Sequence, residues 1–349
     1  MIKTIGILGG GQLGRMLAMA AARLGIRTHI YEPQANPPAG DVAARVWTNA
    51  YDDQAALQAF AKSVDVITYE FENIPTKALD IVETITPVRP RRNALETSQD
   101  RITEKRFLQE IGVNVAPFSE VNSLATLLSS LENVGIPSIL KTRQFGYDGK
   151  GQVKIETMEQ AESAYAALNG APAVLEKLIT FEREISIIAA RNEAGEVSCF
   201  DPGENVHIDG ILHSTTVPAA LSNALQTDAV LLAARILNAL DYVGVMGVEL
   251  FVTNNGLLVN EIAPRVHNSG HWTQNACLVD QFEQHIRAVA GWPLGDGKRH
   301  SNAVMTNLIG DDINHLKKWK NSALHLYGKS EVKPGRKMGH VNSISPKTA

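Results

Sequence analysis

Residues 247–262 read GVELFVTNNGLLVNEI, in which two short apolar runs flank the turn TNNG at 253–256. Asparagine and glycine between apolar runs are typical of a β-hairpin. Folding about Asn254 and Asn255 pairs residues whose numbers sum to about 510, so Glu249 should face Glu261. Facing side chains on paired strands have Cβ atoms roughly 4.5–5.5 Å apart, and like charges at that separation repel.

Two opposed carboxylates in an apolar hairpin indicate a cation between them. Magnesium prefers oxygen ligands, keeps several waters and binds nucleotide phosphates as well. The hairpin therefore predicts a magnesium nucleotide site at Glu249 and Glu261. The alternative is a solvated hairpin face that happens to carry two acids.

Composition is that of an ordinary globular protein. The chain has 349 residues, 44% hydrophobic and 20% charged, which suits about two or three domains. A net charge of −4 gives no general attraction to nucleic acid or membranes. Two cysteines form neither a disulfide framework nor a zinc site, and no run approaches the ~18 apolar residues of a membrane span. The apolar run at 4–8 is too short for a signal sequence, so we expect a cytoplasmic protein.

Strand and helix patterns alternate over residues 1–95, which predicts a parallel α/β unit. From residue 138 onward the strands look antiparallel, so the expected fold class is α/β and α+β. A small segment begins after residue 291, and residues 343–349 are expected to form a loose tail. The expected strands are 5–8, 28–31, 64–69, 138–142, 152–156, 174–179, 184–191 and 197–200, and the expected helices are 12–24, 52–62, 93–111, 227–240 and about 281–290.

A glycine-rich turn, GGGQLG at 9–14, follows the first strand and opens a helix. It fits the G-x-G-x-x-G spacing, and Glu32 ends the next strand. Glycines let backbone N–H groups approach a phosphate at a helix N-terminus, so this segment alone predicts a dinucleotide site. The alternative is a turn whose glycines serve geometry only.

The loop RQFGYDGKGQ at 143–152 joins two expected strands. Three glycines expose backbone amides, and Lys150 with the preceding Lys141 adds positive charge. Such a loop can close over a triphosphate. No Gly-Lys-Ser/Thr runs into a helix, so it is not a Walker loop. A flexible hairpin tip is the alternative.

Three further stretches carry polar chemistry. The strand VLEKLI at 174–179, followed by Glu184, offers carboxylates for an adenine amino group or ribose hydroxyls, although an ordinary strand edge is the better explanation of this stretch in isolation. In the stretch 260–271, Arg265 offers a fork for a planar anion and His267 a proton near neutral pH. The basic turn at 329–340 suits a phosphate monoester, unless it is simply solvated.

Taken together, these stretches resemble the ATP-grasp superfamily, and more closely its family of 5-(carboxyamino)imidazole ribonucleotide synthases. The resemblance spans nearly the whole chain in order. It rests on GGGQLGRM at 9–16, TYEFENIP at 68–75, FGYDGKGQ at 145–152, FEREIS at 181–186, ENVHIDGIL at 204–212, NEIAPRVHNSGHWT at 260–273 and GRKMGHVN at 335–342.

The resemblance implies an ATP-grasp fold with a Rossmann-like domain at 1–95, an ATP-grasp domain at 96–290 with a lid at about 115–175, and a small domain at 291–349. It implies that ATP phosphorylates bicarbonate to carboxyphosphate. The 5-amino group of aminoimidazole ribonucleotide then takes the carboxyl group, directly or through released carbon dioxide. Magnesium is the implied cofactor and a homodimer the implied assembly.

The resemblance also implies roles for single residues. Arg265, His267 and Asn268 match the bicarbonate and carboxyphosphate site, and Glu249 and Glu261 match the metal ligands. The ribonucleotide site comprises Gln12, Leu13, Glu72, Tyr147, Lys329, Arg336 and Lys337. The ATP site comprises Arg101, Lys141, Gly146, Tyr147, Asp148, Gly149, Lys150, Gly151, Gln152, Glu176, Lys177, Leu178, Ile179, Glu184, His207, Asn260 and Glu261.

Two positions depart from the wider superfamily. Ala263 stands where many members carry an asparagine metal ligand, and Phe145 stands where many carry glycine. Three other functions compete: a formate-using glycinamide ribonucleotide transformylase of the same fold, a nicotinamide-dependent oxidoreductase suggested by residues 9–14 and Glu32, and a non-catalytic nucleotide-binding module.

Overall fold

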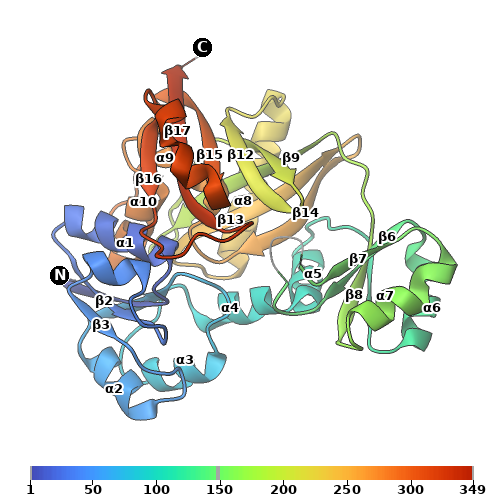
Figure 1. The fold of residues 1–349 in the computed structure, drawn as a ribbon, viewed down its shortest axis with the longest axis horizontal. Helices are drawn as coiled ribbons and strands as arrows, with labels where there is room; N and C mark the ends of the chain where they lie inside the picture. The colour runs from blue at the N-terminus through green and yellow to red at the C-terminus, as the bar shows by residue number, and fades with distance from the viewer. Residues whose placement is uncertain (1, 147–149, 348–349) are drawn as a thin grey trace.

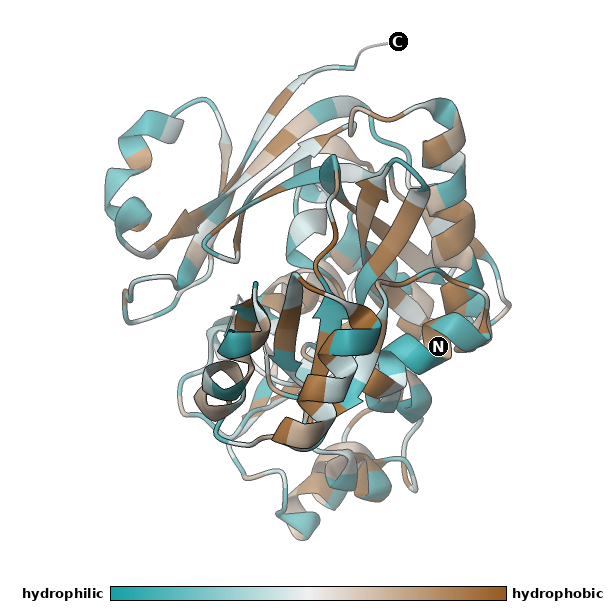
Figure 2. Ribbon diagram, turned by 90° about the vertical axis from the view of Figure 1, so that its right-hand side faces the viewer, coloured by the Kyte–Doolittle hydropathy of each residue, from teal (hydrophilic) through white to brown (hydrophobic). Residues whose placement is uncertain are grey.

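The computed structural model describes residues 2–146 and 150–347, which form three sheets. In Figure 1 an N-terminal unit and a small sheet lie on opposite sides, and a large sheet lies above and between them. The strands are largely hydrophobic in Figure 2, whereas the outer helices also carry hydrophilic residues. No helix within the described ranges is long and apolar enough to cross a membrane.

The N-terminal unit is a parallel sheet in the order β3-β2-β1-β4. All four residues of β4 are buried, as in a parallel sheet that is covered on both faces. Its elements are β1 (Thr4–Leu8), α1 (Gln12–Arg23), β2 (Arg27–Tyr31), η1 (Pro38–Val42), β3 (Arg45–Trp47), α2 (Gln54–Lys62), β4 (Val66–Tyr69) and α3 (Thr76–Val82).

Two helices, α4 (Arg92–Gln99) and α5 (Arg101–Glu110), connect this unit to the next. The prediction of one continuous helix over 93–111 is therefore wrong at its centre, where the chain leaves the helical conformation at Asp100. Asp100 takes an extended conformation, and its carboxylate accepts hydrogen bonds from the backbone N–H groups of Ile102 and Thr103. It is the N-cap of α5, and an N-cap residue is not helical.

The small sheet is antiparallel in the order β5-β8-β6-β7. Two helices cover it, and they share with it a core that includes Leu127, Leu140 and Leu175. The elements are β5 (Phe118–Val121), α6 (Leu124–Val134), β6 (Ser138–Thr142), β7 (Gln152–Ile155), η2 (Met158–Gln160), α7 (Ala161–Ala167) and β8 (Ala173–Lys177).

The central sheet has nine strands in the order β14-β13-β9-β11-β12-β15-β17-β16, with β10 beside β9. Its elements are β9 (Arg183–Arg191), β10 (Val197–Cys199), β11 (Gly203–Ile208), β12 (Ile211–Val217), α8 (Asn223–Ala239), β13 (Gly244–Thr253), β14 (Gly256–Ala263), η3 (Asn268–Gly270), α9 (Thr273–Ala276), α10 (Gln281–Ala290), β15 (Ser301–Ile309), η4 (Gly310–Trp319), β16 (Ala323–Leu326) and β17 (Lys337–Pro346).

The C-terminal segment continues this central sheet, because β15 pairs with β12 and β17 pairs with β15. The expectation of a loose tail from residue 343 is wrong as far as Pro346, which pairs with Ser301. The main chain of residues 343–346 is held by the strand ladder between β15 and β17.

The hairpin of β13 and β14 has the predicted register: Glu249 is the direct partner of Glu261. The next pair along is Leu250 with Val259, so Asn260 is the extra residue of a β-bulge. A bulge bends the strand locally and re-aims side chains, which is common beside active sites.

One buried histidine joins the N-terminal unit to the central sheet. His285 of α10 accepts a hydrogen bond from Val245 N–H through Nδ1 at 3.0 Å, so Nε2 carries the proton and donates it to Thr68 Oγ1 at 2.8 Å. Burial lowers the pKa of His285 to about 3.

We predict that His285→Leu destabilises the protein by about 1–3 kcal/mol, because the buried Val245 N–H loses its acceptor. Between about pH 3 and 6.5 the unfolded chain binds a proton at His285 that the folded chain does not. The free energy of unfolding should therefore decrease as the pH is lowered. This one group should account for a decrease of about 1 kcal/mol between pH 7 and pH 5.5. Urea denaturation at both pH values should show a smaller fall in the variant; an unchanged fall would contradict the assignment.

Candidate active site

A single large cavity of ≈ 1030 Å³ collects most of the residues selected from the sequence. Of those predicted residues that are described, only Gly151 lies outside its lining; Tyr147, Asp148 and Gly149 lie outside the described residues. The lining includes Gln12, Leu13, Glu72, Arg101, Lys141, Gly146, Lys150, Gln152, Glu176, Lys177, Leu178, Ile179, Glu184, His207, Glu249, Asn260, Glu261, Arg265, His267, Asn268, Lys329, Arg336 and Lys337.

Gly151 supports the loop between β6 and β7 instead. It has a φ of +69°, and a Cβ there would lie 2.7 Å from Thr142 Oγ1. Its carbonyl accepts the backbone N–H of Thr142. Phe145, also in this loop, has a φ of 61°, in the left-handed region that favours glycine.

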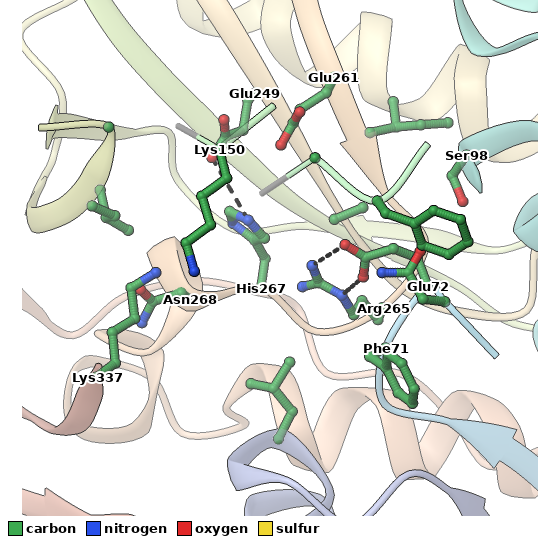
Figure 3. Close-up of a pocket in the computed structure, with 18 of the residues that line it drawn as sticks. Phe71, Glu72, Ser98, Lys150, Glu249, Glu261, Arg265, His267, Asn268 and Lys337 are labelled. Atoms are coloured by element: carbon green, nitrogen blue, oxygen red, sulfur yellow. Dashed lines mark hydrogen bonds and ion pairs between the residues drawn. The ribbon is translucent and has the colours of Figure 1, made fainter. Parts of the chain in front are cut away.

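The opposed carboxylates of the hairpin lie within the cavity (Figure 3). Burial, and then the charge of Glu261, raise the pKa of Glu249 to about 7. Glu261 has a cationic partner, since its Oε2 lies 3.2 Å from Arg101 Nη1. Glu249 Oε1 lies 3.6 Å from His267 Nε2. The pair therefore holds more negative potential than its protein neighbours neutralise.

This donor set fits a hard divalent cation with few protein ligands. The described residues contain no group of three or more histidine, cysteine, aspartate or glutamate side chains that could hold a metal. Two carboxylates with water and phosphate oxygens are what magnesium ordinarily accepts. A bound cation would also reverse the electrostatic cost of ionising Glu249.

Glu176 lies between two lysines, one of which sequence reasoning missed. Its Oε2 is 3.0 Å from Lys141 Nζ and 3.2 Å from Lys105 Nζ. Burial opposes ionisation, but the lysines outweigh it and lower the pKa of Glu176. Among the described residues no donor reaches the buried Glu176 Oε1. It can therefore accept a hydrogen bond from a ligand.

Glu104 is a second group that the sequence did not reveal. It lines the cavity and is 4% exposed. Burial and the charge of Glu261 raise its pKa to about 8. Glu104 and Lys105 belong to the helical stretch expected over 93–111, which is rich in charge. Nothing in its pattern distinguished the two buried charges from their exposed neighbours.

His207 and Glu184 form an ion pair through His207 Nδ1 and Glu184 Oε2. Burial disfavours a charged imidazole, but the hydrogen bond to Glu184 and the charge of Glu249 outweigh it and raise the pKa of His207. The two residues come from β11 and β9, which are adjacent in the sheet.

Arg265 holds Glu72 through two hydrogen bonds, from Nε to Oε2 and from Nη2 to Oε1, the latter at 2.9 Å (Figure 3). Although burial opposes ionisation, Arg265 lowers the pKa of Glu72 to about 2. The fork predicted for an external anion is thus engaged by an internal carboxylate in this structure. An external anion must compete with Glu72 or meet the remaining N–H groups.

His267 is a neutral imidazole. Burial, with Arg265 and Lys337 adding to it, lowers its pKa to about 3, and its Nδ1 lies 2.8 Å from Ser269 Oγ. This differs from the expectation of a group that titrates near neutral pH, because burial first and neighbouring positive charges second oppose its protonation. A neutral His267 can still donate or accept one hydrogen bond.

The glycine-rich turn does not offer an open phosphate site. Glu70 accepts hydrogen bonds from Gly11 N–H at 2.8 Å and Gly14 N–H at 3.0 Å, and Glu32 accepts one from Gly10 N–H at 2.9 Å. A Cβ on Gly11 would lie 2.7 Å from Glu70 Oε1. The chain's own carboxylates therefore occupy the backbone donors that would bind a dinucleotide. This arrangement disfavours the dinucleotide site that residues 9–14 and Glu32 suggest when taken alone.

The basic turn is folded against itself while facing the cavity. Lys329 Nζ donates to the Lys337 carbonyl at 2.7 Å, and Arg336 Nη1 donates to the Glu331 carbonyl at 3.0 Å. These contacts hold three cationic side chains on one wall. The loop between β6 and β7 contributes Lys150 to the same cavity.

Comparison with known proteins supports this geometry. The ATP-grasp domain model matches residues 106–282, the ribonucleotide synthetase preATP-grasp domain model matches residues 2–99, and the phosphoribosylaminoimidazole carboxylase C-terminal domain model matches residues 303–349.

Relatives extend over the whole chain. The N5-carboxyaminoimidazole ribonucleotide synthase of Brucella melitensis is 57% identical over 99% of this chain and 97% of its own length. The N5-carboxyaminoimidazole synthetase of Staphylococcus aureus complexed with ADP has a TM-score of 0.94 and 37% identity, covering 98% of this chain and 93% of that one. The Aspergillus clavatus enzyme in complex with ADP and 5-aminoimidazole ribonucleotide has a TM-score of 0.92 and 32% identity, covering 99% and 94%.

The similarity covers nearly the whole chain, and it agrees with the family to which the motifs pointed. This chain belongs to the N5-carboxyaminoimidazole ribonucleotide synthase family of ATP-grasp ligases.

Proposed function

We propose that the protein carboxylates the 5-amino group of aminoimidazole ribonucleotide with ATP and bicarbonate. The products are 5-(carboxyamino)imidazole ribonucleotide, ADP and phosphate. The observation that carries the proposal is one cavity that joins the opposed Glu249 and Glu261 to a cationic lid and a basic turn. Relatives solved with ADP, and with ADP and the ribonucleotide, support it.

ATP is assigned to the side of the cavity formed by β6, β8 and the hairpin. Glu176 Oε1 is suited to accept from the adenine amino group, because it is buried without a protein donor among the described residues. Lys141, Arg101 and Lys150 supply positive charge for the phosphates. Glu249 and Glu261 would hold magnesium, which when bound neutralises phosphate charge and orients the transferred group.

Bicarbonate and the ribonucleotide are assigned to the side formed by residues 265–268 and the basic turn. Arg265 provides charge for a developing carboxyphosphate. The neutral His267 can accept or donate a hydrogen bond without a net charge that would compete with the arginine. Lys329, Arg336 and Lys337 suit a phosphate group that is nearly dianionic at neutral pH.

The competing functions lack comparable support. The occupied glycine turn opposes a nicotinamide-dependent oxidoreductase. A formate-using transformylase would share the nucleotide side, but it takes formate in place of bicarbonate and glycinamide ribonucleotide as acceptor. The segment from Arg265 to His271 favours the bicarbonate enzyme. We further propose that the protein is cytoplasmic and forms a homodimer. Light scattering coupled to gel filtration tests the dimer by measuring its mass in solution.

The assay that tests the function measures ADP release with each acceptor. Release should require magnesium and aminoimidazole ribonucleotide, and labelled bicarbonate should appear in the product. Turnover with formate and glycinamide ribonucleotide, or oxidation of NADH, would contradict the proposal.

We predict that Glu249→Gln abolishes turnover yet raises the apo melting temperature by a few degrees. The substitution removes a buried, half-ionised carboxylate that faces a like charge. Glu261→Gln should also abolish turnover, but without that gain in stability, because it loses the ion pair with Arg101. Scanning calorimetry without metal separates the variants; full activity in both would exclude the metal site.

We predict that Arg336→Ala raises the Michaelis constant for the ribonucleotide by about 10- to 100-fold, the scale of one charge-assisted hydrogen bond. ATP affinity, measured by calorimetric titration, should stay near wild type. The phosphate-free nucleoside should be a poor substrate for both proteins. The substitution should change its Michaelis constant little. If the variant weakens ATP instead, the basic turn is not the phosphate site.

A further inference from the structure

The side chain of Asn268, which lines the cavity, is held by a residue outside it. Asn268 Nδ2 donates to Asn307 Oδ1 at 3.0 Å, and Asn307 Nδ2 donates back to Asn268 Oδ1 at 2.7 Å. Asn307 lies on β15 and is 1% exposed. The two amides thus form a reciprocal pair between the sheet and the cavity wall.

The orientation of this pair is fixed by a backbone carbonyl. Asn307 Nδ2 also donates to the Leu212 carbonyl oxygen at 2.8 Å. A carbonyl can only accept, so Asn307 must turn its NH₂ group toward Leu212 and the same atom must serve Asn268 Oδ1. Amide orientation is ordinarily assigned from such partners, and here one carbonyl determines it for both asparagines.

The carbonyl itself is rigidly placed. Leu212 lies on β12 and Asn307 on β15, and these strands pair directly, with Ser214 opposite Thr306. Asn307 is also opposite His340 of β17. The orientation of the Asn268 side-chain amide is therefore set by strands in the middle of the central sheet, and not by the loop that carries Asn268.

A fixed orientation matters because Asn268 has one N–H left after it pairs with Asn307. If both amides turned over, Asn307 would present an oxygen to the Leu212 carbonyl, which is unfavourable in a buried site. The second N–H of Asn268 Nδ2 consequently points in one fixed direction. Figure 3 shows Asn268 beside His267, with Lys150 and Lys337 pointing toward the same part of the cavity. A donor among these groups suits an anionic oxygen.

We propose that Asn307 is a positioning residue for the bicarbonate-dependent step, acting only through the amide of Asn268. The inference rests on the proposed function, since it assigns the anion to bicarbonate or to carboxyphosphate formed from it. Asn307 is not among the described residues that line the cavity, and it reaches the lining through the Asn268 side chain and the Leu212 carbonyl. That carbonyl can only accept, so Asn268 is the partner through which Asn307 can direct a hydrogen-bond donor to the anion.

A double-mutant cycle tests this inference. Asn307→Leu should lower kcat/KM for bicarbonate by about tenfold, the scale of a misdirected hydrogen bond to a charged group. Michaelis constants for ATP and the ribonucleotide should stay within about twofold of wild type. In the Asn268→Ala background, Asn307→Leu should cause no further loss. Equal losses in both backgrounds would overturn the proposal.

Asn342→Leu is the matched control. Asn342 is likewise a buried asparagine of this sheet, 1% exposed, but it donates to the His271 carbonyl and to Asn275 Oδ1. It should lose stability without a selective change in the bicarbonate dependence. If it reproduces the effect of Asn307→Leu, the effect is one of fold stability and the proposal fails.

A spectroscopic measurement separates this inference from the proposed function. The side-chain amide resonance of Asn268 is identified by its loss in Asn268→Ala. It should shift in Asn307→Leu and stay in place in Asn342→Leu, whatever substrate the enzyme uses. If wild type fails to carboxylate the ribonucleotide, the function is wrong; if the resonance does not move in Asn307→Leu, the amide pairing is wrong.

Discussion

The site depends on one electrostatic constraint, the opposition of Glu249 and Glu261 across a buried hairpin. Two carboxylates in that position repel each other, and burial raises the pKa of Glu249 to about 7. The surrounding groups partly compensate: Arg101 pairs with Glu261, and His207 is drawn toward its charged form by Glu184 and Glu249. The remaining negative potential suits a cation, and a bound cation together with Arg101, Lys141 and Lys150 would suit a polyphosphate.

The N-terminal unit shows how a familiar motif can have another role. The spacing of Gly9, Gly11 and Gly14 is that of a dinucleotide-binding turn, yet Glu70 fills the backbone donors. Gly9 and Gly11 are needed because a Cβ on either would collide with the Glu70 side chain, at 2.5 Å and 2.7 Å. An internal anion stabilises the helix N-terminus as an external phosphate would. The turn then serves as a rigid cavity wall that carries Gln12 and Leu13.

Local patterns were sufficient for some features and not for others. The hairpin register followed from turn chemistry alone, and three of the four strands of the N-terminal unit followed from periodicity, whereas the three-residue β3 did not. The break at Asp100 did not, because a strong N-cap within a charged helical run looks like one more polar residue. The contacts of Lys105 with Glu176, Asn307 with Asn268 and Glu70 with Gly11 join residues far apart in sequence. Such pairings are set by tertiary packing, which no single segment encodes.

The central claim is that the opposed carboxylates hold a divalent cation together with the nucleotide. Titration with Mn²⁺ in the presence of ADP, followed by electron paramagnetic resonance, measures this directly. Wild type should bind the ion, and Glu249→Gln and Glu261→Gln should each weaken binding by about tenfold or more, as expected for loss of a ligand. Equal Mn²⁺ binding in wild type and both variants would contradict the account.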